Sequence, residues 1–134
     1  MTRTLLYVSC SKVAFPDRGE IQNIVDVARA RNSTLDVTGG LIATPKSFSQ
    51  VLEGPSDAID ELMESICRDV RHEQVLVVLD HLVERRRFPL WAMAYSGPAT
   101  YVQRLIDPLA AAPKEANAAS CQRLIRFIHE YSTK

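Results

Sequence analysis

The sequence has no excess of either charge and no long hydrophobic run. Sixteen basic and sixteen acidic residues balance within 134 positions, so the chain lacks the basic surplus typical of nucleic-acid-binding proteins. No apolar stretch approaches the roughly 20 residues that a membrane-spanning helix needs. The apolar run at the N-terminus is also too short for a signal peptide. We therefore expect a soluble, cytoplasmic protein that binds neither nucleic acid nor membrane.

Cysteine and the familiar catalytic motifs are also scarce. Cys10, Cys67 and Cys121 are far apart, lie in apolar surroundings and lack metal-ligand spacing, so we expect three reduced core thiols. The three histidines are scattered, which gives no zinc-binding pattern. Neither a glycine-rich phosphate loop nor a nucleophile elbow is present. These absences argue against a zinc enzyme, a P-loop enzyme and a serine hydrolase.

Length and periodicity predict one domain of mixed secondary structure. A chain of 134 residues with 46% hydrophobic and 24% charged side chains suits a single globular core. Apolar periodicity predicts the order β-α-β-β-α-β-β, followed by two more helices. The expected strands are 4–10, 37–44, 47–53, 75–79 and 90–95, and the expected helices are 20–31, one that follows an N-cap at Ser56, 100–111 and 115–131.

This order is the ferredoxin-like arrangement with one additional strand, an α+β fold with a five-stranded sheet. Two helices would cover one face, and the two C-terminal helices would cover the other face or form a dimer contact. The continuously apolar run 75–79 is typical of a central strand covered on both faces. Asp17 and Glu20 have the spacing of a capping box before the first helix. We expect a core at 1–96 and a C-terminal helical cap, output or oligomerisation segment at 97–134.

One strand carries a polar side chain among apolar ones. In SFSQVLEGP, at 47–55, Phe48, Gln50 and Leu52 share a strand face. Burying the amide of Gln50 without partners would cost ~1–3 kcal/mol. The sequence therefore raises the question of what Gln50 is bonded to.

Other side chains are predicted to face the same space. Tyr7 lies in the middle of the first strand, Asn32 ends the apolar stripe of the first helix, and Trp91 and Met93 are in phase on the last strand. Taken singly, each is more often a packing or capping residue. Taken together, they suggest a pocket between the first two helices and the sheet for a flat, hydrogen-bonding heterocycle.

Several segments of the chain resemble the blue-light-using-flavin (BLUF) domain family. The segment containing QVLEG and the Arg-Phe-Pro-x-Trp-x-Met run are the most specific. The sequence departs from the family pattern at Ser49, at Gly40 and at Arg31, an unfamiliar neighbour for Asn32. The matching segments span roughly the first two-thirds of the chain: LLYVS at 5–9, ARARNSTLDVTGGLI at 28–42, SFSQVLEGP at 47–55, RDVRHEQV at 68–75 and RRFPLWAM at 86–93.

The resemblance implies a noncovalently bound flavin, FAD ahead of FMN or riboflavin. It implies that Tyr7 donates an electron and a proton to the excited flavin, and that Gln50 is the switch residue bonded to both. Trp91 and Met93 would relay the signal, and which of the two lies near Gln50 is left open. The flavin contacts that the resemblance implies are Ile24, Arg31, Asn32, Phe48, Gln50, Leu52, Asp69, Arg71 and His72.

The resemblance predicts a stand-alone blue-light photoreceptor without a catalytic domain. Its signal would pass to an unidentified partner protein or through a homo-oligomer, a dimer or larger. One alternative is a flavin-binding module that has lost light switching. A second is a small ferredoxin-like hydrolase of the acylphosphatase kind, which needs an arginine loop near the first strand, where this chain offers only Lys12 and Arg18.

Overall fold

The computed structural model describes residues 1–12, 18–96, 100–112 and 118–132. The order of strands and helices agrees with the prediction, and Asp17 of the predicted capping box lies outside the described residues. The elements are β1 (Thr2–Ser11), α1 (Arg18–Thr34), β2 (Thr38–Ala43), β3 (Ser47–Gly54), α2 (Ser56–Arg68), β4 (His72–Val83), β5 (Trp91–Ser96), α3 (Thr100–Ala111) and α4 (Ala118–Ser132).

The five strands form one mixed sheet in the order β4-β1-β3-β2-β5. β1 lies antiparallel to both β3 and β4, β2 lies antiparallel to β3, and β5 lies parallel to β2 at the edge. The first four strands therefore have the ferredoxin-like arrangement, with β5 as the added strand. In the register of β1 and β3, Tyr7 lies opposite Gln50, so the two side chains emerge from the same face.

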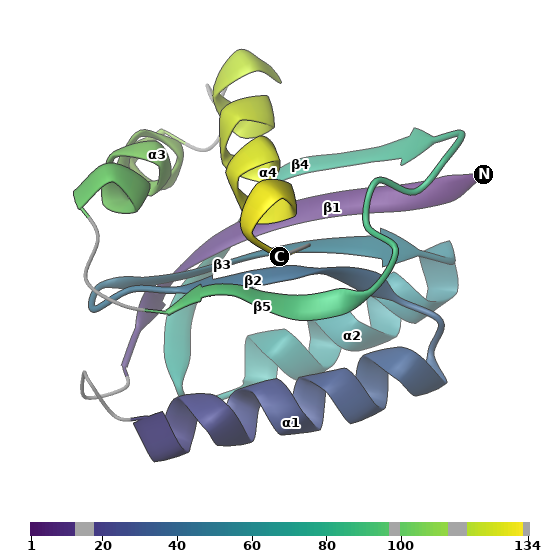
Figure 1. The fold of residues 1–134 in the computed structure, drawn as a ribbon, viewed down its shortest axis with the longest axis horizontal. Helices are drawn as coiled ribbons and strands as arrows, with labels where there is room; N and C mark the ends of the chain where they lie inside the picture. Colours follow the sequence, from purple (N-terminus) through teal and green to yellow (C-terminus); the bar gives the residue numbers. More distant parts are fainter. Residues whose placement is uncertain (13–17, 97–99, 113–117, 133–134) are drawn as a thin grey trace.

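Each face of the sheet is covered by a pair of helices, as predicted. Figure 1 shows α1 and α2 on one side of the sheet and α3 and α4 on the other. Phe48 and Leu52 pack in the cluster under α1 and α2, while Val51 packs in the cluster under α3 and α4. All eight residues of β3 are buried, because the C-terminal helices cover the face that a two-layer protein would leave in water.

The central position predicted for residues 75–79 is wrong, since β4 is an edge strand. Val77 is 44% exposed. The pairing of β1 with β4 shifts between Leu6 and Tyr7, which leaves Val78 as an extra residue. Val78 and Leu79 both pack against the cluster under α3 and α4. The apolar run thus reflects a bulge and the C-terminal cover rather than a central place in the sheet.

Helix α4 is anchored by one apolar stripe. Cys121, Leu124, Ile125 and Ile128 are all buried, as their spacing predicts.

The prediction of three core thiols is correct only for Cys121, because Cys10 is partly buried and Cys67 is exposed on α2. Among the described residues, no helix has the length and hydrophobicity to cross a membrane.

The N-cap predicted at Ser56 is also wrong. Pro55 is the N-cap of α2, and its carbonyl oxygen accepts a hydrogen bond from the backbone N–H of Ile59 at 3.1 Å. Ser56 is therefore the first helical residue, and the helix begins one residue earlier than predicted. Serine favours a cap when its side chain accepts a backbone N–H, but the cap of α2 is made without a side-chain hydrogen bond.

Two contacts fasten the segment that leads into β5. The buried carboxylate of Glu53 accepts hydrogen bonds from the backbone N–H groups of Arg87 at 2.7 Å and Phe88 at 2.9 Å, and from the hydroxyl of Thr4 at 2.7 Å. The N–H of Gly39 donates to the carbonyl oxygen of Leu90 at 3.1 Å. The segment just before β5 is thus bonded to both β2 and β3.

Gly39 occupies a position that no other residue can take without strain. Its φ is +146°, and a Cβ there would lie 1.8 Å from the carbonyl oxygen of Val51. Backbone with positive φ favours glycine, and the close approach of β2 to β3 leaves no space for a side chain. This glycine therefore fixes how closely β2 lies against β3 beside Gln50.

Candidate functional site

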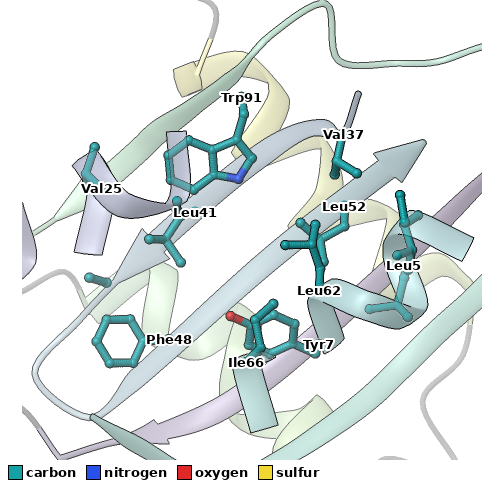
Figure 2. Packing of buried hydrophobic residues seen from close by; sticks show 14 residues of the cluster. Leu5, Tyr7, Val25, Val37, Leu41, Phe48, Leu52, Leu62, Ile66 and Trp91 are labelled. Carbon is teal, nitrogen blue, oxygen red and sulfur yellow. The ribbon is translucent and has the colours of Figure 1, made fainter. Parts of the chain in front are cut away.

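A cavity lies between α1, α2 and the sheet, where the sequence predicts a pocket. The atom-free space in it is about 490 Å³, part of it open to solvent. Figure 2 shows part of its apolar wall, including the side chains of Leu41, Phe48 and Ile66. The predicted site residues that line this cavity are Tyr7, Ile24, Arg31, Phe48, Gln50, Asp69, Arg71, His72 and Trp91.

A chain of buried hydrogen bonds joins three of these side chains. Gln50 Nε2 donates to the hydroxyl of Tyr7 at 2.8 Å, and Trp91 Nε1 donates to Gln50 Oε1 at 2.8 Å. Tyr7 is 2%, Gln50 5% and Trp91 7% exposed. Both ends of the buried amide are therefore bonded within the protein, and Trp91 of β5 contacts Gln50. For Met93 the structure describes the backbone, which pairs with Leu41.

The indole of Trp91 fixes which way the amide of Gln50 points. An indole N–H can only donate a hydrogen bond, so its partner must be an oxygen. Rotating the amide by half a turn would place its NH₂ group against the indole N–H, two donors facing each other. The bond between Trp91 and Gln50 therefore stabilises one of the two amide orientations.

Asn32 provides a second acceptor for the same indole. Its side chain is 1% exposed. With its amide oriented so that the nitrogen donates to the carbonyl oxygen of Ala28 at 3.2 Å, its oxygen lies 3.0 Å from Trp91 Nε1. Asn32 does not line the cavity; it borders a groove on the other side of Trp91. Leu52, also predicted as a contact, packs in the same apolar cluster without lining the cavity.

Tyr7 is a neutral phenol held in an apolar setting. Burial raises its pKa well above the ordinary value, and the hydrogen bond from Gln50 acts in the opposite direction but is outweighed. The charge of Asp69 raises the pKa further, while that of Arg31 lowers it. Tyr7 therefore keeps its proton across the physiological pH range.

Asp69 and Arg71 form an ion pair at one end of the cavity. Arg71 Nη2 lies 2.6 Å from Asp69 Oδ2, and the backbone N–H of Arg71 donates to Asp69 Oδ1 at 2.9 Å. The hydrogen bond from the Arg71 side chain is the main cause that lowers the pKa of Asp69. The pair presents polar groups at the cavity edge with its charge largely neutralised.

His72 is fixed between β1 and the end of α2. Its Nε2 lies 2.7 Å from the carbonyl oxygen of Ile66, and its Nδ1 lies 2.8 Å from the hydroxyl oxygen of Ser9. Because a carbonyl only accepts, Nε2 carries the proton and, in the neutral ring, Nδ1 accepts from Ser9. The ring meets Tyr7 and Phe48 edge-on, with centroid distances of 6.1 and 5.8 Å. His72 thereby supports the two aromatic side chains of the cavity wall.

Arg31 leaves one donor without a partner. Its Nη1 donates to the hydroxyl of Ser65 on α2 at 2.8 Å, but its buried Nε has no hydrogen-bond partner. A buried N–H of this kind costs ~1–3 kcal/mol unless something supplies an acceptor. Apolar walls, the amide of Gln50 and this donor together fit a planar heterocycle that carries carbonyl groups, as a flavin does.

The profile of the family described as "Sensors of blue-light using FAD" (BLUF) matches residues 2–94. The blue light- and temperature-regulated antirepressor BluF of Escherichia coli (strain K12) is 35% identical over 88 residues, 66% of this chain and 22% of that protein. The photoactivated adenylate cyclase subunit alpha of Euglena gracilis is 36% identical over 84 residues, 62% of this chain and 8% of that protein. The chain thus matches less than a quarter of each relative's length.

Solved structures resemble nearly the whole chain. The dark-state structure of BlrB, a BLUF protein, superposes with a TM-score of 0.75 at 29% identity and covers 96% of both chains. The photo-activated state of BlsA gives a TM-score of 0.78 at 22% identity, covering 96% of this chain and 95% of that one, a likeness of fold. The family profile spans more than two-thirds of the sequence, and this chain belongs to the BLUF family of blue-light sensors.

Proposed function

We propose that the cavity binds a flavin noncovalently, FAD ahead of FMN or riboflavin, and that Gln50 converts light absorption into a change of hydrogen bonding. The observation that carries this proposal is the buried chain from Tyr7 through Gln50 to Trp91 at the cavity wall. It links a side chain that can be oxidised to an amide with two possible orientations, and the amide to the edge strand β5.

A bound flavin supplies blue-light absorption and, once excited, a strong demand for one electron. In this proposal Tyr7 would supply the electron, since its phenol can be oxidised and is bonded to Gln50 at 2.8 Å. When Tyr7 loses an electron its hydroxyl becomes strongly acidic and a poor acceptor for the hydrogen bond that Gln50 Nε2 donates to it at 2.8 Å. Rotation of the amide would then turn its oxygen toward the hydroxyl, where it can accept the phenol proton. Tyr7 then regains both electron and proton, so no group is oxidised overall and only the form of Gln50 differs.

The change in Gln50 alters the hydrogen bond that the indole of Trp91 donates. A rotated Gln50 amide presents NH₂ to the indole N–H, so the bond from Trp91 to Gln50 is lost. Asn32, whose oxygen lies 3.0 Å from Trp91 Nε1, then becomes the remaining acceptor. A hydrogen bond is worth ~0.5–1.5 kcal/mol net, which changes the ratio of two conformations by roughly two- to tenfold. That is enough to bias the position of β5.

The other predicted residues complete the site in this proposal. Ile24, Phe48 and Leu52 provide apolar packing near the ring. Arg31 serves its polar edge, and Asn32, which does not line the cavity, supports the site through its contact with Trp91. The group Asp69, Arg71 and His72 serves the chain that carries the phosphate. Met93 shares the relay with Trp91.

The same proposal assigns roles to larger parts of the chain. Residues 1–96 sense light in the cytoplasm, and 97–134 carry the output. The chain signals to a partner protein or to another copy of itself, as a dimer or larger, rather than catalysing a reaction. The support for this output route is the packing of α3 and α4 on the sheet that holds Gln50.

Absorption spectra taken in the dark and directly after blue light test the proposal. We expect a flavin band that moves slightly to the red and returns in the dark. A Gln50→Leu variant should bind flavin but show no shift. A flavin band that never moves would favour the light-inert binding module, and a colourless protein would favour the hydrolase. A shift that persists in Gln50→Leu would refute the role of Gln50.

A further inference from the structure

Arg31 connects the two helices that form the cavity. It lies in the last turn of α1, and its Nη1 donates to the hydroxyl of Ser65 on α2 at 2.8 Å. It lines the cavity on one side and the groove between α1 and α2 on the other. The hydrogen bond to Ser65 holds the planar guanidinium in one place, which gives its remaining N–H groups a fixed direction.

Arg31 has no ion-pair partner in the part of the chain that the structure describes. The other arginine of the cavity wall, Arg71, is paired with Asp69 at 2.6 Å. The Nε–H of Arg31 is buried and lacks an acceptor. A cation with an unused buried donor is completed by an electron-rich oxygen or nitrogen of a ligand, because a guanidinium can only donate.

We propose that the charge of Arg31, held in place by Ser65, makes the bound flavin easier to reduce. This inference rests on the proposed flavin binding. Reduction adds electron density to the ring, so a fixed cation beside it stabilises the reduced form more than the oxidised form. The effect is larger at a partly buried site than in water, because the protein screens charge less.

The charge of Arg31 also reaches the electron donor. It lowers the pKa of Tyr7, against the larger effect of burial. One cation therefore acts on both the residue that gives the electron and the group that receives it. Arg31 would therefore adjust the energetics of electron transfer from Tyr7 to the flavin, whereas Gln50 would respond to that transfer by changing its hydrogen bonds.

The test compares three substitutions in the full chain loaded with FAD. Arg31→Gln removes the charge, and Ser65→Ala leaves the charge but removes the bond that fixes it. Arg29→Gln is the matched control, because Arg29 is exposed on the same helix and does not line the cavity. The dark midpoint potential is measured by reduction with dithionite beside a reference dye, and the dissociation constant of FAD by titration.

We expect Arg31→Gln to lower the preference for reduced over oxidised flavin by about tenfold, or about 30 mV for a two-electron couple. Ser65→Ala should shift the potential in the same direction by less, and Arg29→Gln should match the wild type. If Arg31→Gln does not fold, Arg31→Lys keeps the charge but loses the planar donor, and a potential below that of the wild type is again expected.

A potential in the Arg31 variants equal to that of Arg29→Gln overturns the proposal, even if FAD binds more weakly. If Arg31 only held α1 and α2 together, its substitution would weaken FAD binding but leave the midpoint potential unchanged. A wild-type protein that binds no FAD fails at the earlier step, since it refutes the proposed function together with this inference.

Discussion

Replacing Gln50 by leucine tests whether Asn32 accepts a hydrogen bond from Trp91. The substitution introduces an apolar side chain of similar size and removes the hydrogen bonds that join Gln50 to Tyr7 and to Trp91, each 2.8 Å long. In the single variant Gln50→Leu, which keeps Asn32, the indole N–H of Trp91 still has an acceptor, the side-chain oxygen of Asn32 at 3.0 Å. In a chain that also carries Asn32→Ala, the indole N–H is buried with no acceptor.

The size of the expected effect depends on whether the indole N–H of Trp91 keeps an acceptor. A net loss of ~0.5–1.5 kcal/mol is expected for each hydrogen bond removed, and ~1–3 kcal/mol for a buried donor left without a partner. The double variant should therefore lose about 1–2 kcal/mol more than the sum of the two single losses. The other bonds of Asn32, such as that to Ala28, are lost equally in both backgrounds and cancel in the cycle.

The free energy of unfolding is measured by urea titration of the four proteins at saturating FAD. Flavin binding stabilises each variant by an amount set by its dissociation constant, so that constant is measured and its contribution subtracted. Losses that add to within about 0.5 kcal/mol would mean that the two sites are independent. Asn32 would then not accept from Trp91, and the proposed exchange of partners at the indole would be refuted.

Three further predictions concern single positions. Gly39→Ala places a Cβ 1.8 Å from the carbonyl oxygen of Val51 and should cost about 3 kcal/mol, lowering Tm by about 10 °C; a Tm equal to that of the wild type would contradict the packing of β2 on β3. The pKa of Tyr7 is raised in the folded protein, so the stability it confers below its unfolded pKa is lost as pH rises above about 10. Tyr7→Phe should therefore lose less stability between pH 9 and 11 than the wild type in urea unfolding, and equal losses would argue against a buried phenol. Glu53→Gln weakens the acceptor for Arg87 and Phe88 and should cost about 1–3 kcal/mol, whereas the exposed Glu84→Gln should be neutral; equal effects of the two would show that Glu53 does not hold this segment.

The faces of the strands could be predicted from the sequence because strand periodicity is strict. Tyr7 and Gln50 lie on one face, and their bond follows from a register that pairs them directly. The burial of both sheet faces was also predictable, since α4 carries a clear apolar stripe that needs a partner surface. Pattern alone therefore located the cavity and its central amide.

Strand order and side-chain contacts could not be predicted in the same way. The apolar run of β4 is compatible with a central or an edge strand, and the bulge at Val78 together with the cover by α3 and α4 explains why so many of its residues are apolar. The exposure of Cys67 depends on which side of α2 meets the sheet. The unpartnered Nε of Arg31 and the approach of Asn32 to Trp91 depend on rotamers, which leave no trace in residue spacing.

The buried carboxylate of Glu53 decides where β5 can move. It holds the backbone of Arg87 and Phe88, and Gly39 holds Leu90, so the residues just before Trp91 are fixed to the two neighbouring strands. A strand anchored at its first end cannot slide as a whole. A displacement that begins at Trp91 must therefore bend the rest of β5, whose pairing with β2 continues to Ser96 with one register shift after Leu41. We therefore expect the later part of β5, toward Ser96, to be where a partner would detect the change.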